Sequence, residues 1–352
     1  MLLKRRMYHH CLWAAVQATI YSRGESSPLK THAAEGKSTR FQRPKSKNVK
    51  NDVLFMPGVR ACTPQVHRFN ASDRSAILRL LTDGGPNSAL ICGDTEAVLS
   101  QLPGCIFQTC VTSPPYWSLR DYGIPGQIGL ETDVAAYVDH LVKVFAQVRR
   151  CLRDDGTLWL NIGDSYTSGG RTWRATDKKN PVRAMSVRPP TPEGLKPKDL
   201  IGVPWLLAFA LQKDGWYLRN DIIWNKPNCQ PESVKDRPTR SHEYLFLFSK
   251  SEHYHYDHEA VRGPNGRNVR SVWDIHTRPY AEAHFATFPP ALVEPCLKLG
   301  SKSGDLVLDP FIGSGTTGLV ALQQERRFVG IELNPSYLQI AEDRLNGDLI
   351  RE

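Results

Sequence analysis

The chain has 352 residues, enough to bury a full core, and it is basic, with 45 Lys and Arg against 36 Asp and Glu. All of the net charge of +9 lies in the first 60 residues, which hold 12 cations and 3 acids, so charge alone does not make the remaining chain a nucleic-acid binder. The eight cysteines include no Cys-x-x-Cys pair, and no apolar run is long enough to span a membrane. These features argue against a disulfide framework, a zinc site and a membrane protein, and we expect no bound metal.

The N-terminal segment 1–75 is rich in Lys, Arg, Ser and Pro and has little apolar periodicity. We expect it to be a basic, disordered extension, with an organelle presequence as the alternative if the source is eukaryotic. The ordered domain is then expected over 76–345, followed by a short tail at 346–352.

Apolar runs and helical periodicities alternate along that domain. One helix is expected from about 134 to 152, where Thr132 or Asp133 can cap its start and Gly156 can end it. Strands are expected at 89–92, 107–111, 157–162, 221–224, 243–248, 305–308 and 328–331, and further helices near 202–213, 289–299 and 316–324. Strands that alternate with helices predict an α/β fold, with a largely parallel sheet covered on both faces.

A glycine-containing turn, Asp309 to Thr317, follows one expected strand and opens a helix. Gly313 and Gly315 allow a tight turn and close approach of a ligand, while Glu332, at the end of the next strand, can accept both ribose hydroxyls of a nucleoside. The full Gly-x-Gly-x-x-Gly pattern is met only loosely, so the turn alone also fits a dehydrogenase or a structural role. With the acid, it predicts a nucleoside site.

The sharper motif is Ser113-Pro114-Pro115-Tyr116, at the end of another expected strand. Two prolines fix the backbone and remove two N–H donors, so the serine oxygen and the Pro114 carbonyl can hold the two hydrogens of an amino group. Tyr116 can stack on a planar ring. This arrangement suits the attack of an aromatic amine on a sulfonium methyl, and the alternative is that the prolines only end the strand.

These two motifs, in this order, resemble the circularly permuted (beta-group) S-adenosylmethionine-dependent DNA amino-methyltransferases, over about 76–345. The resemblance implies a Rossmann-like fold whose seven-stranded, mostly parallel sheet has helices on both faces and an antiparallel last strand pair. It implies that the catalytic residues are Ser113, Pro114, Pro115 and Tyr116. It implies that S-adenosyl-L-methionine contacts Asp309, Phe311, Gly313, Gly315, Thr316, Glu332, Asp94 and Phe288.

The same resemblance places substrate residues after the strand at 221–224. Trp224 and Lys226 would border a flipped base, although a core position is nearly as good an interpretation of the tryptophan. Segment 165–199 is basic and is expected to be a mobile, DNA-facing loop. Segment 228–282 is the expected target-recognition region. Its arginines could form paired hydrogen bonds to guanine, and the expected substrate-binding residues include Arg237 and Arg240. The other arginines of the segment are Arg262, Arg267 and Arg270.

Serine as the first tetrapeptide residue favours N4 of cytosine as the target within this family, while aspartate favours N6 of adenine. The expected reaction is methylation of double-stranded DNA by base flipping and direct displacement, with no covalent enzyme intermediate. Adenine-N6 methylation, an RNA or protein methyltransferase and a non-catalytic DNA-binding module remain alternatives. Pro295-Cys296 would suit a cytosine-C5 enzyme, but its apolar neighbours favour a core thiol.

A cognate restriction endonuclease acting on the same site is left open, as is the choice between monomer and dimer. If the source is bacterial, we expect a cytoplasmic, nucleoid-associated enzyme, whereas an organelle or the nucleus fits a eukaryotic source.

Overall fold

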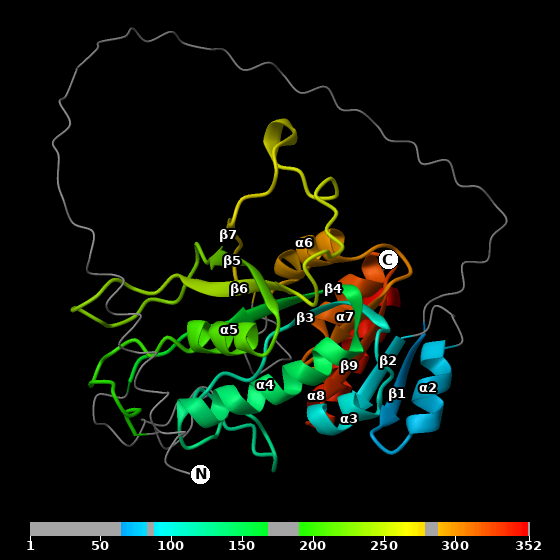
Figure 1. The fold of residues 1–352 in the computed structure, drawn as a ribbon, viewed down its shortest axis with the longest axis horizontal. Helices are drawn as coiled ribbons and strands as arrows, with labels where there is room; N and C mark the ends of the chain where they lie inside the picture. Colours follow the sequence, from blue (N-terminus) through cyan, green and yellow to red (C-terminus); the bar gives the residue numbers. More distant parts are fainter. Residues whose placement is uncertain (1–64, 83–87, 168–189, 279–287, 351–352) are drawn as a thin grey trace, which may run out of the picture. The chain divides into compact units, whose positions relative to one another are not determined.

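The computed structural model describes residues 65–82, 88–167, 190–278 and 288–350 (Figure 1). The expected extension before residue 65 and most of the expected DNA-facing loop, 168–189, lie outside the described residues. Two boundaries of the expected ordered domain differ from the structure. Strand β1 (Val66–Asn70) lies inside the segment expected to be a tail, and helix α8 (Pro335–Ile350) continues into the expected C-terminal tail.

Nine strands of the described ranges form one mixed sheet, in the order β1-β2-β9-β8-β3-β4-β6-β5-β7 (Figure 1). Eight of these strands run in the same direction, and β6 is antiparallel to its two neighbours. Besides β1, the strands are β2 (Ser88–Cys92), β3 (Phe107–Thr112), β4 (Leu152–Ile162), β5 (Tyr217–Asn225), β6 (His242–Ser249), β7 (Val272–Asp274), β8 (Leu306–Asp309) and β9 (Arg327–Glu332).

The expectation of seven strands is therefore corrected to nine. The two additional strands lie at the edges of the sheet, β1 beside β2 and β7 beside β5. Both are short, three residues in β7 and five in β1. Neither carries a long apolar run, and pairing with an edge is what makes them strands.

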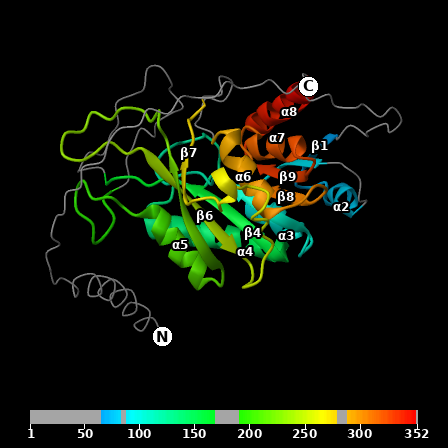
Figure 2. The same ribbon diagram turned by 90° about the horizontal axis from the view of Figure 1, so that it is seen from above.

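Helices cover both faces of the sheet, as expected (Figure 2). One core cluster joins the sheet to α2, α3, α4 and α5, and the other joins the opposite face to α6, α7 and α8. Neighbouring strand residues alternate between the clusters: Cys110 belongs to the first and Val111 to the second. The helix bounds are α2 (Arg74–Thr82), α3 (Thr95–Gln101), α4 (Val134–Cys151), α5 (Val203–Lys213), α6 (Pro290–Gly300) and α7 (Thr316–Gln323), with a short 3-10 helix at η2 (Pro264–Gly266).

The longest of these helices on the first face, α4, begins where its sequence predicts. The Asp133 carboxylate accepts a hydrogen bond from the Ala136 N–H at 2.8 Å and so caps the first turn. Its end differs from the expectation, because β4 starts at Leu152 and Gly156 lies within that strand. A Cβ at Gly156 would lie 2.9 Å from the Arg153 carbonyl, so crowding, rather than a helix end, explains the glycine.

The strand order changes direction between β8 and β3, which makes this pair a topological switch point. From β8 the chain passes through α7 to β9 on one side, and from β3 it passes through α4 to β4 on the other. In open α/β sheets, ligands bind outside the carboxyl ends of the strands at such a switch point. Both expected motifs, the Ser-Pro-Pro-Tyr segment and the glycine turn, start at this point. No helix in the described ranges has the length and apolar character needed to span a bilayer.

Candidate functional site

The two motifs meet at the carboxyl ends of neighbouring strands. The Thr112 hydroxyl, one residue before Ser113, donates a 2.6 Å hydrogen bond to Oδ1 of Asp309, where the glycine turn begins. On the other side of the turn, the Thr317 hydroxyl donates to the Val111 carbonyl at 3.2 Å. Segments that are distant in the sequence are therefore joined by direct side-chain contacts, as the proposed site requires.

The glycine turn holds a carboxylate beside it. Gly313 and Gly315 have φ values of 51° and 83°, and a Cβ at Gly315 would lie 3.2 Å from the Cβ of Ala341 in α8. The Gly313 N–H donates to Oε2 of Glu332 at 3.1 Å, and the Asn334 N–H donates to Oε1 at 2.9 Å. The expected ribose-binding acid is thus oriented by backbone donors at the tip of β9.

Burial perturbs both acids at these strand ends. It raises the pKa of Glu332 to about 7, against the opposing effect of the backbone N–H groups that bind it. Burial also raises the pKa of Asp309 to about 6, although the hydroxyls of Thr112 and Thr317 and the Phe311 N–H act to lower it. A ligand that donates hydrogen bonds or carries positive charge here would therefore favour the ionised carboxylates.

Asp309 also retains an acceptor. Its side chain is buried, and no described residue makes a hydrogen bond of normal geometry to Oδ2. The Thr317 hydroxyl lowers the pKa of Asp309, and it donates its hydrogen bond to the Val111 carbonyl. A buried carboxylate oxygen without a donor fits a site that a polar ligand completes.

The structure also describes three other expected cofactor residues. Asp94 follows β2, is exposed, and caps α3 by accepting from the Ala97 N–H at 2.9 Å. The preceding residue, Gly93, donates its N–H to the Glu332 carbonyl at 3.0 Å, which places Asp94 beside the tip of β9. Phe311 is half-buried against the α4 side of the core, and Phe288 is half-buried just before α6.

Thr316, another expected cofactor residue, is the first residue of α7. Its side chain is buried, and its hydroxyl accepts a 3.0 Å hydrogen bond from the Arg344 guanidinium of α8. The same guanidinium donates to the Ser314 carbonyl at 3.1 Å. The Thr316 hydroxyl therefore helps to hold the glycine turn in place, and a contact of Thr316 with the cofactor stays a prediction.

The Ser-Pro-Pro-Tyr segment is fixed from behind by α4. The Tyr137 hydroxyl donates to the Pro115 carbonyl at 2.8 Å. The Pro114 carbonyl, by contrast, accepts no hydrogen bond from any described residue. The Ser113 hydroxyl has one long contact, 3.5 Å, to the Tyr116 hydroxyl. Two acceptors on one short segment are therefore available to the hydrogens of an amino group.

A polar cluster that the sequence did not reveal lies behind Tyr116. The Tyr116 hydroxyl donates to Oε2 of Glu243 at 2.8 Å and lies 3.3 Å from Oδ1 of Asn161. The Lys226 ammonium pairs with the other oxygen of Glu243. Burial, and then the charge of Glu243, raise the pKa of Tyr116 well above its ordinary value, so it remains a neutral phenol. Gly163 gives the ring its space, because a Cβ there would lie 2.8 Å from it.

One signal could have identified Glu243 and Asn161. Each is a polar residue beside an apolar run of its strand, Glu243 just before the run 244–248 in β6 and Asn161 just after the run 158–160 in β4. Because β6 runs antiparallel to β4, the start of one and the end of the other meet at the same edge of the sheet as the two motifs.

The expected base-stacking role of Trp224 is not supported. Its side chain is 3% exposed, belongs to the second core cluster, and donates its indole N–H to the Ile275 carbonyl at 2.8 Å. A tryptophan in a strand can belong to the core when its indole N–H has a hydrogen-bond acceptor. Lys226, 4.2 Å above that indole ring, does reach the site through Glu243.

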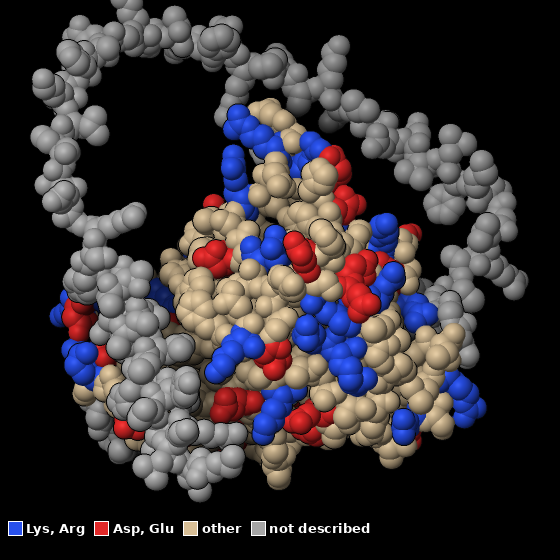
Figure 3. All heavy atoms as spheres, in the orientation of Figure 1, with Lys and Arg blue, Asp and Glu red and all other residues tan. Residues whose placement is uncertain are grey.

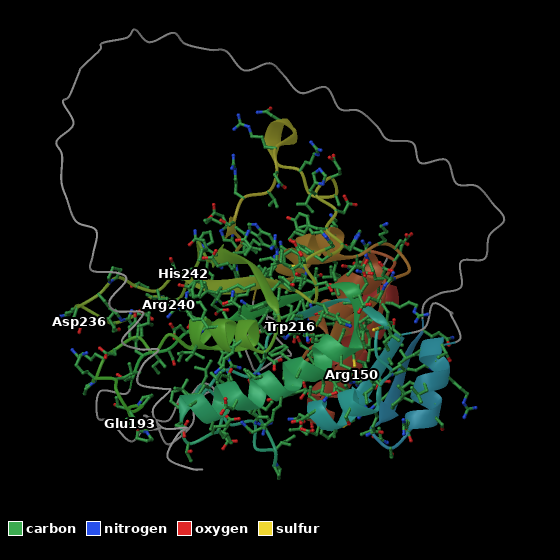
Figure 4. The ribbon with its side chains drawn as sticks, in the orientation of Figure 1. Arg150, Glu193, Trp216, Asp236, Arg240 and His242 are labelled. Carbon is green, nitrogen blue, oxygen red and sulfur yellow. The ribbon has the colours of Figure 1, made fainter. Side chains whose placement is uncertain are left out.

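Arg237 and Arg240 lie on the segment that joins β5 to β6, and Figure 4 labels the second of them near His242. Arg237 pairs with Glu232 at 2.6 Å and stacks 3.8 Å from the ring of Tyr166. Arg240 is 3.8 Å from Asp164, a buried acid. Both guanidinium groups are held by contacts within the protein, and the reading of guanine by them stays a prediction.

The expected target-recognition region includes β6, an interior strand of the sheet. Between β6 and β7 it projects as a segment around η2, with cationic side chains at its tip (Figure 3). The exposed arginines of this segment are Arg262, Arg267 and Arg270.

Cys296 lies in the core, as expected. It is fully buried in α6 and its thiol contacts the Leu292 carbonyl at 3.1 Å. Burial raises the pKa of the thiol well above its ordinary value. A thiol in this state cannot act as the nucleophile of a cytosine-C5 mechanism.

Comparison with known proteins agrees with this geometry. Residues 107–343 match the N6/N4 methyltransferase family, described as DNA methylase. The type II methyltransferase M.Cfr9I of Citrobacter freundii is 62% identical over 265 residues, which cover 74% of this chain and 88% of the relative. M.SmaI of Serratia marcescens is 62% identical over 262 residues, covering 73% and 90%.

Solved structures show the same fold. TTHA0409 of Thermus thermophilus, in complex with S-adenosyl-L-methionine, has a TM-score of 0.53 and 28% identity, covering 74% of this chain and 96% of that one. The PvuII DNA methyltransferase, described as cytosine-N4-specific, has a TM-score of 0.57 and 21% identity, covering 75% and 92%. With residues 107–343 matched and close relatives matched over most of their length, the chain belongs to the DNA methylase family and is an S-adenosylmethionine-dependent DNA methyltransferase.

Proposed function

We propose that this enzyme methylates the exocyclic N4 of cytosine in double-stranded DNA. The observation that carries the proposal is the 2.6 Å hydrogen bond from Thr112 to Asp309, which holds the serine-proline segment beside the glycine turn. Serine at the first position of the tetrapeptide favours cytosine over adenine. The fold shared with the cytosine-N4-specific PvuII enzyme is compatible with that target.

The residues at the glycine turn fit S-adenosyl-L-methionine. Glu332, already oriented by backbone donors, would accept the ribose hydroxyls, and the buried Asp309 supplies a carboxylate with a spare oxygen. Gly313 and Gly315 shape the turn through their positive φ values, and Phe311 and Phe288 would provide apolar walls. Asp94 would lie at the adenine end, and Thr316 would contribute only through its backbone. When bound, the cofactor supplies an electrophilic methyl group on a sulfonium.

The catalytic residues in this proposal are Ser113, Pro114, Pro115 and Tyr116. The lone pair of an aromatic amine is delocalised into its ring, which makes the amine a poor nucleophile. Hydrogen bonds from its two hydrogens to Oγ of Ser113 and the Pro114 carbonyl favour a more tetrahedral nitrogen and direct the lone pair toward the methyl carbon. Tyr116 would stack on the ring.

The target base must leave the duplex to reach this segment, at a cost of a few kcal/mol. We propose that segments 165–199 and 228–282, within a catalytic domain spanning about 66–350, hold the DNA, and that the arginines of the second segment read the site. We also propose the circularly permuted motif order, because the Ser-Pro-Pro-Tyr segment precedes the glycine turn. The type II names of the relatives support a cognate endonuclease.

Digestion of methylated DNA to nucleosides tests the proposal. Plasmid DNA incubated with the enzyme and methyl-labelled cofactor should yield labelled N4-methyldeoxycytidine by mass spectrometry. The Ser113→Ala variant should bind the cofactor with unchanged affinity and should transfer the methyl group at least about tenfold more slowly than the wild type. Label in N6-methyldeoxyadenosine would assign the enzyme to the other target of its family, and label in 5-methyldeoxycytidine would contradict the site itself.

A further inference from the structure

In the polar cluster around Tyr116, the neighbouring groups determine which atoms donate hydrogen bonds and which accept them. A serine hydroxyl can donate or accept, and the proposed reaction needs Ser113 as an acceptor for a hydrogen of the target amine. Nothing in the Ser-Pro-Pro-Tyr sequence imposes that choice. The groups that face Tyr116 from β4, β5 and β6 do impose it.

The Tyr116 hydroxyl faces two acceptors. One is Oε2 of Glu243 at 2.8 Å, and the other is Oδ1 of Asn161 at 3.3 Å. The Asn161 amide is oriented by its own N–H groups, which donate to Glu243 at 3.3 Å and to the Tyr244 carbonyl at 3.2 Å. An ionised carboxylate accepts only, so the single hydrogen of the phenol must point toward this pair.

Lys226 supplies the countercharge. Its ammonium pairs with Oε1 of Glu243, and both side chains are less than one-fifth exposed, at 17% and 19%. The ammonium also lies 4.2 Å above the Trp224 ring, which fixes its position. Oε1 of Glu243 is thereby occupied, and Oε2 is left to Tyr116 and Asn161.

Because the Tyr116 hydroxyl donates its only hydrogen to Glu243, its oxygen can only accept a hydrogen bond from Ser113. The Ser113 hydroxyl, 3.5 Å away, then directs its own hydrogen to Tyr116 and keeps its lone pairs available as acceptors. We propose that Glu243, paired with Lys226, is a positioning residue that sets the hydrogen-bond polarity of the chain Ser113–Tyr116–Glu243 and so makes Ser113 an acceptor for the target amino group.

This inference rests on the proposed function of Ser113. It adds that a residue with no place in the tetrapeptide controls the tetrapeptide's chemistry. A carboxamide at position 243 can turn either a donor or an acceptor toward Tyr116, so it preserves the shape of the cluster and removes its direction.

A double-mutant cycle on the full-length enzyme tests the inference. Glu243→Gln and Tyr116→Phe should each lower kcat by about 10- to 100-fold, the cost of one hydrogen bond to a charged group. KM for the cofactor should stay unchanged. The double variant should be no slower than the slower single variant, because both changes break the same chain. The matched control is Glu342→Gln, which removes a carboxylate of α8 that pairs with Arg68 of β1 at 3.2 Å. This variant should keep wild-type kcat.

A merely structural role gives a different pattern. It would lower the fraction of enzyme that binds cofactor, and the two single effects would then multiply in the double variant. Either that multiplication or wild-type kcat in Glu243→Gln would overturn the inference. If Glu243→Gln fails to fold, Tyr116→Phe decides, since it leaves the ion pair intact: wild-type kcat in that variant refutes the chain.

The same panel separates this inference from the proposed function. Full activity in Ser113→Ala would refute the proposed role of the serine. Loss of activity in Ser113→Ala together with full activity in both other single variants would refute only the hydrogen-bond chain.

Discussion

Replacement of Glu332 by glutamine should weaken cofactor binding and change its dependence on pH. Both carboxylate oxygens are held by backbone N–H groups, and burial raises the pKa to about 7, so the free enzyme holds this group half-protonated near neutrality. Ribose hydroxyls bind the ionised form better than the neutral form. Cofactor binding should therefore release a proton and strengthen as the pH rises.

The size of the effect follows from that pKa. With a free-enzyme pKa of about 7, the ionised fraction is about one-tenth at pH 6 and about nine-tenths at pH 8, so wild-type affinity should rise about tenfold across this interval. In Glu332→Gln, the carboxamide oxygen can still accept one hydrogen bond, but the charge-assisted hydrogen bond to the second carboxylate oxygen is lost. At pH 8 it should cost roughly 1.5–3 kcal/mol, or about 10- to 150-fold in Kd.

Isothermal titration calorimetry in buffers of different ionisation enthalpy measures both the affinity and the proton release. Glu332→Gln should show nearly constant affinity above pH 7, with any remaining dependence near pH 6 due to Asp309. Glu325→Gln, which changes an exposed acid whose carboxylate accepts a hydrogen bond from the Ser303 hydroxyl at 3.1 Å, is the control. A wild-type affinity that does not change between pH 6 and 8, or a Glu332→Gln variant with wild-type affinity at pH 8, would refute the reasoning.

Three further predictions concern stability and the alternative chemistry. Gly315→Ala should lower the free energy of unfolding by more than the roughly 1–2 kcal/mol expected for Gly304→Ala. Both glycines have φ of 83°, but only Gly315 has a close neighbour at the position of an added Cβ. The difference between the two variants in urea unfolding measures the cost of that contact. Thr112→Val removes a donor to the buried Asp309 and raises that pKa further, so its destabilisation, about 1–3 kcal/mol, should be larger at pH 8 than at pH 5 in thermal melts; equal losses would contradict this sign. Cys296→Ala should retain kcat within about twofold, whereas an inactive but folded variant would revive the thiolate mechanism.

The sequence was most informative where chemistry requires a rare combination of residues. Two prolines after a buried strand, and two glycines followed 17 residues later by an acid, identify Ser113 and Glu332 as site residues from type and spacing alone. The sequence alone does not show that Ser113 and Glu332 belong to the same site. That follows from β3 and β8 being neighbours, with Thr112 and Asp309 in contact.

Other features depended on partners that are distant in the sequence. Trp224 and Thr316 were expected to face ligands, but the Ile275 carbonyl and the Arg344 guanidinium satisfy their polar atoms inside the fold. The edge strands β1 and β7 carry weak local patterns and exist through pairing. Glu243 was missed for the same reason, because its importance lies in side chains that come together from the ends of β3, β4, β5 and β6.

A crystal structure of the enzyme with a non-reactive cofactor analogue and a DNA duplex containing its target site tests the central claim most directly. We predict a flipped cytosine whose N4 lies about 3 Å from both Oγ of Ser113 and the Pro114 carbonyl, with the analogue's ribose on Glu332. A target base seated elsewhere, or an N4 that contacts neither acceptor, would contradict it.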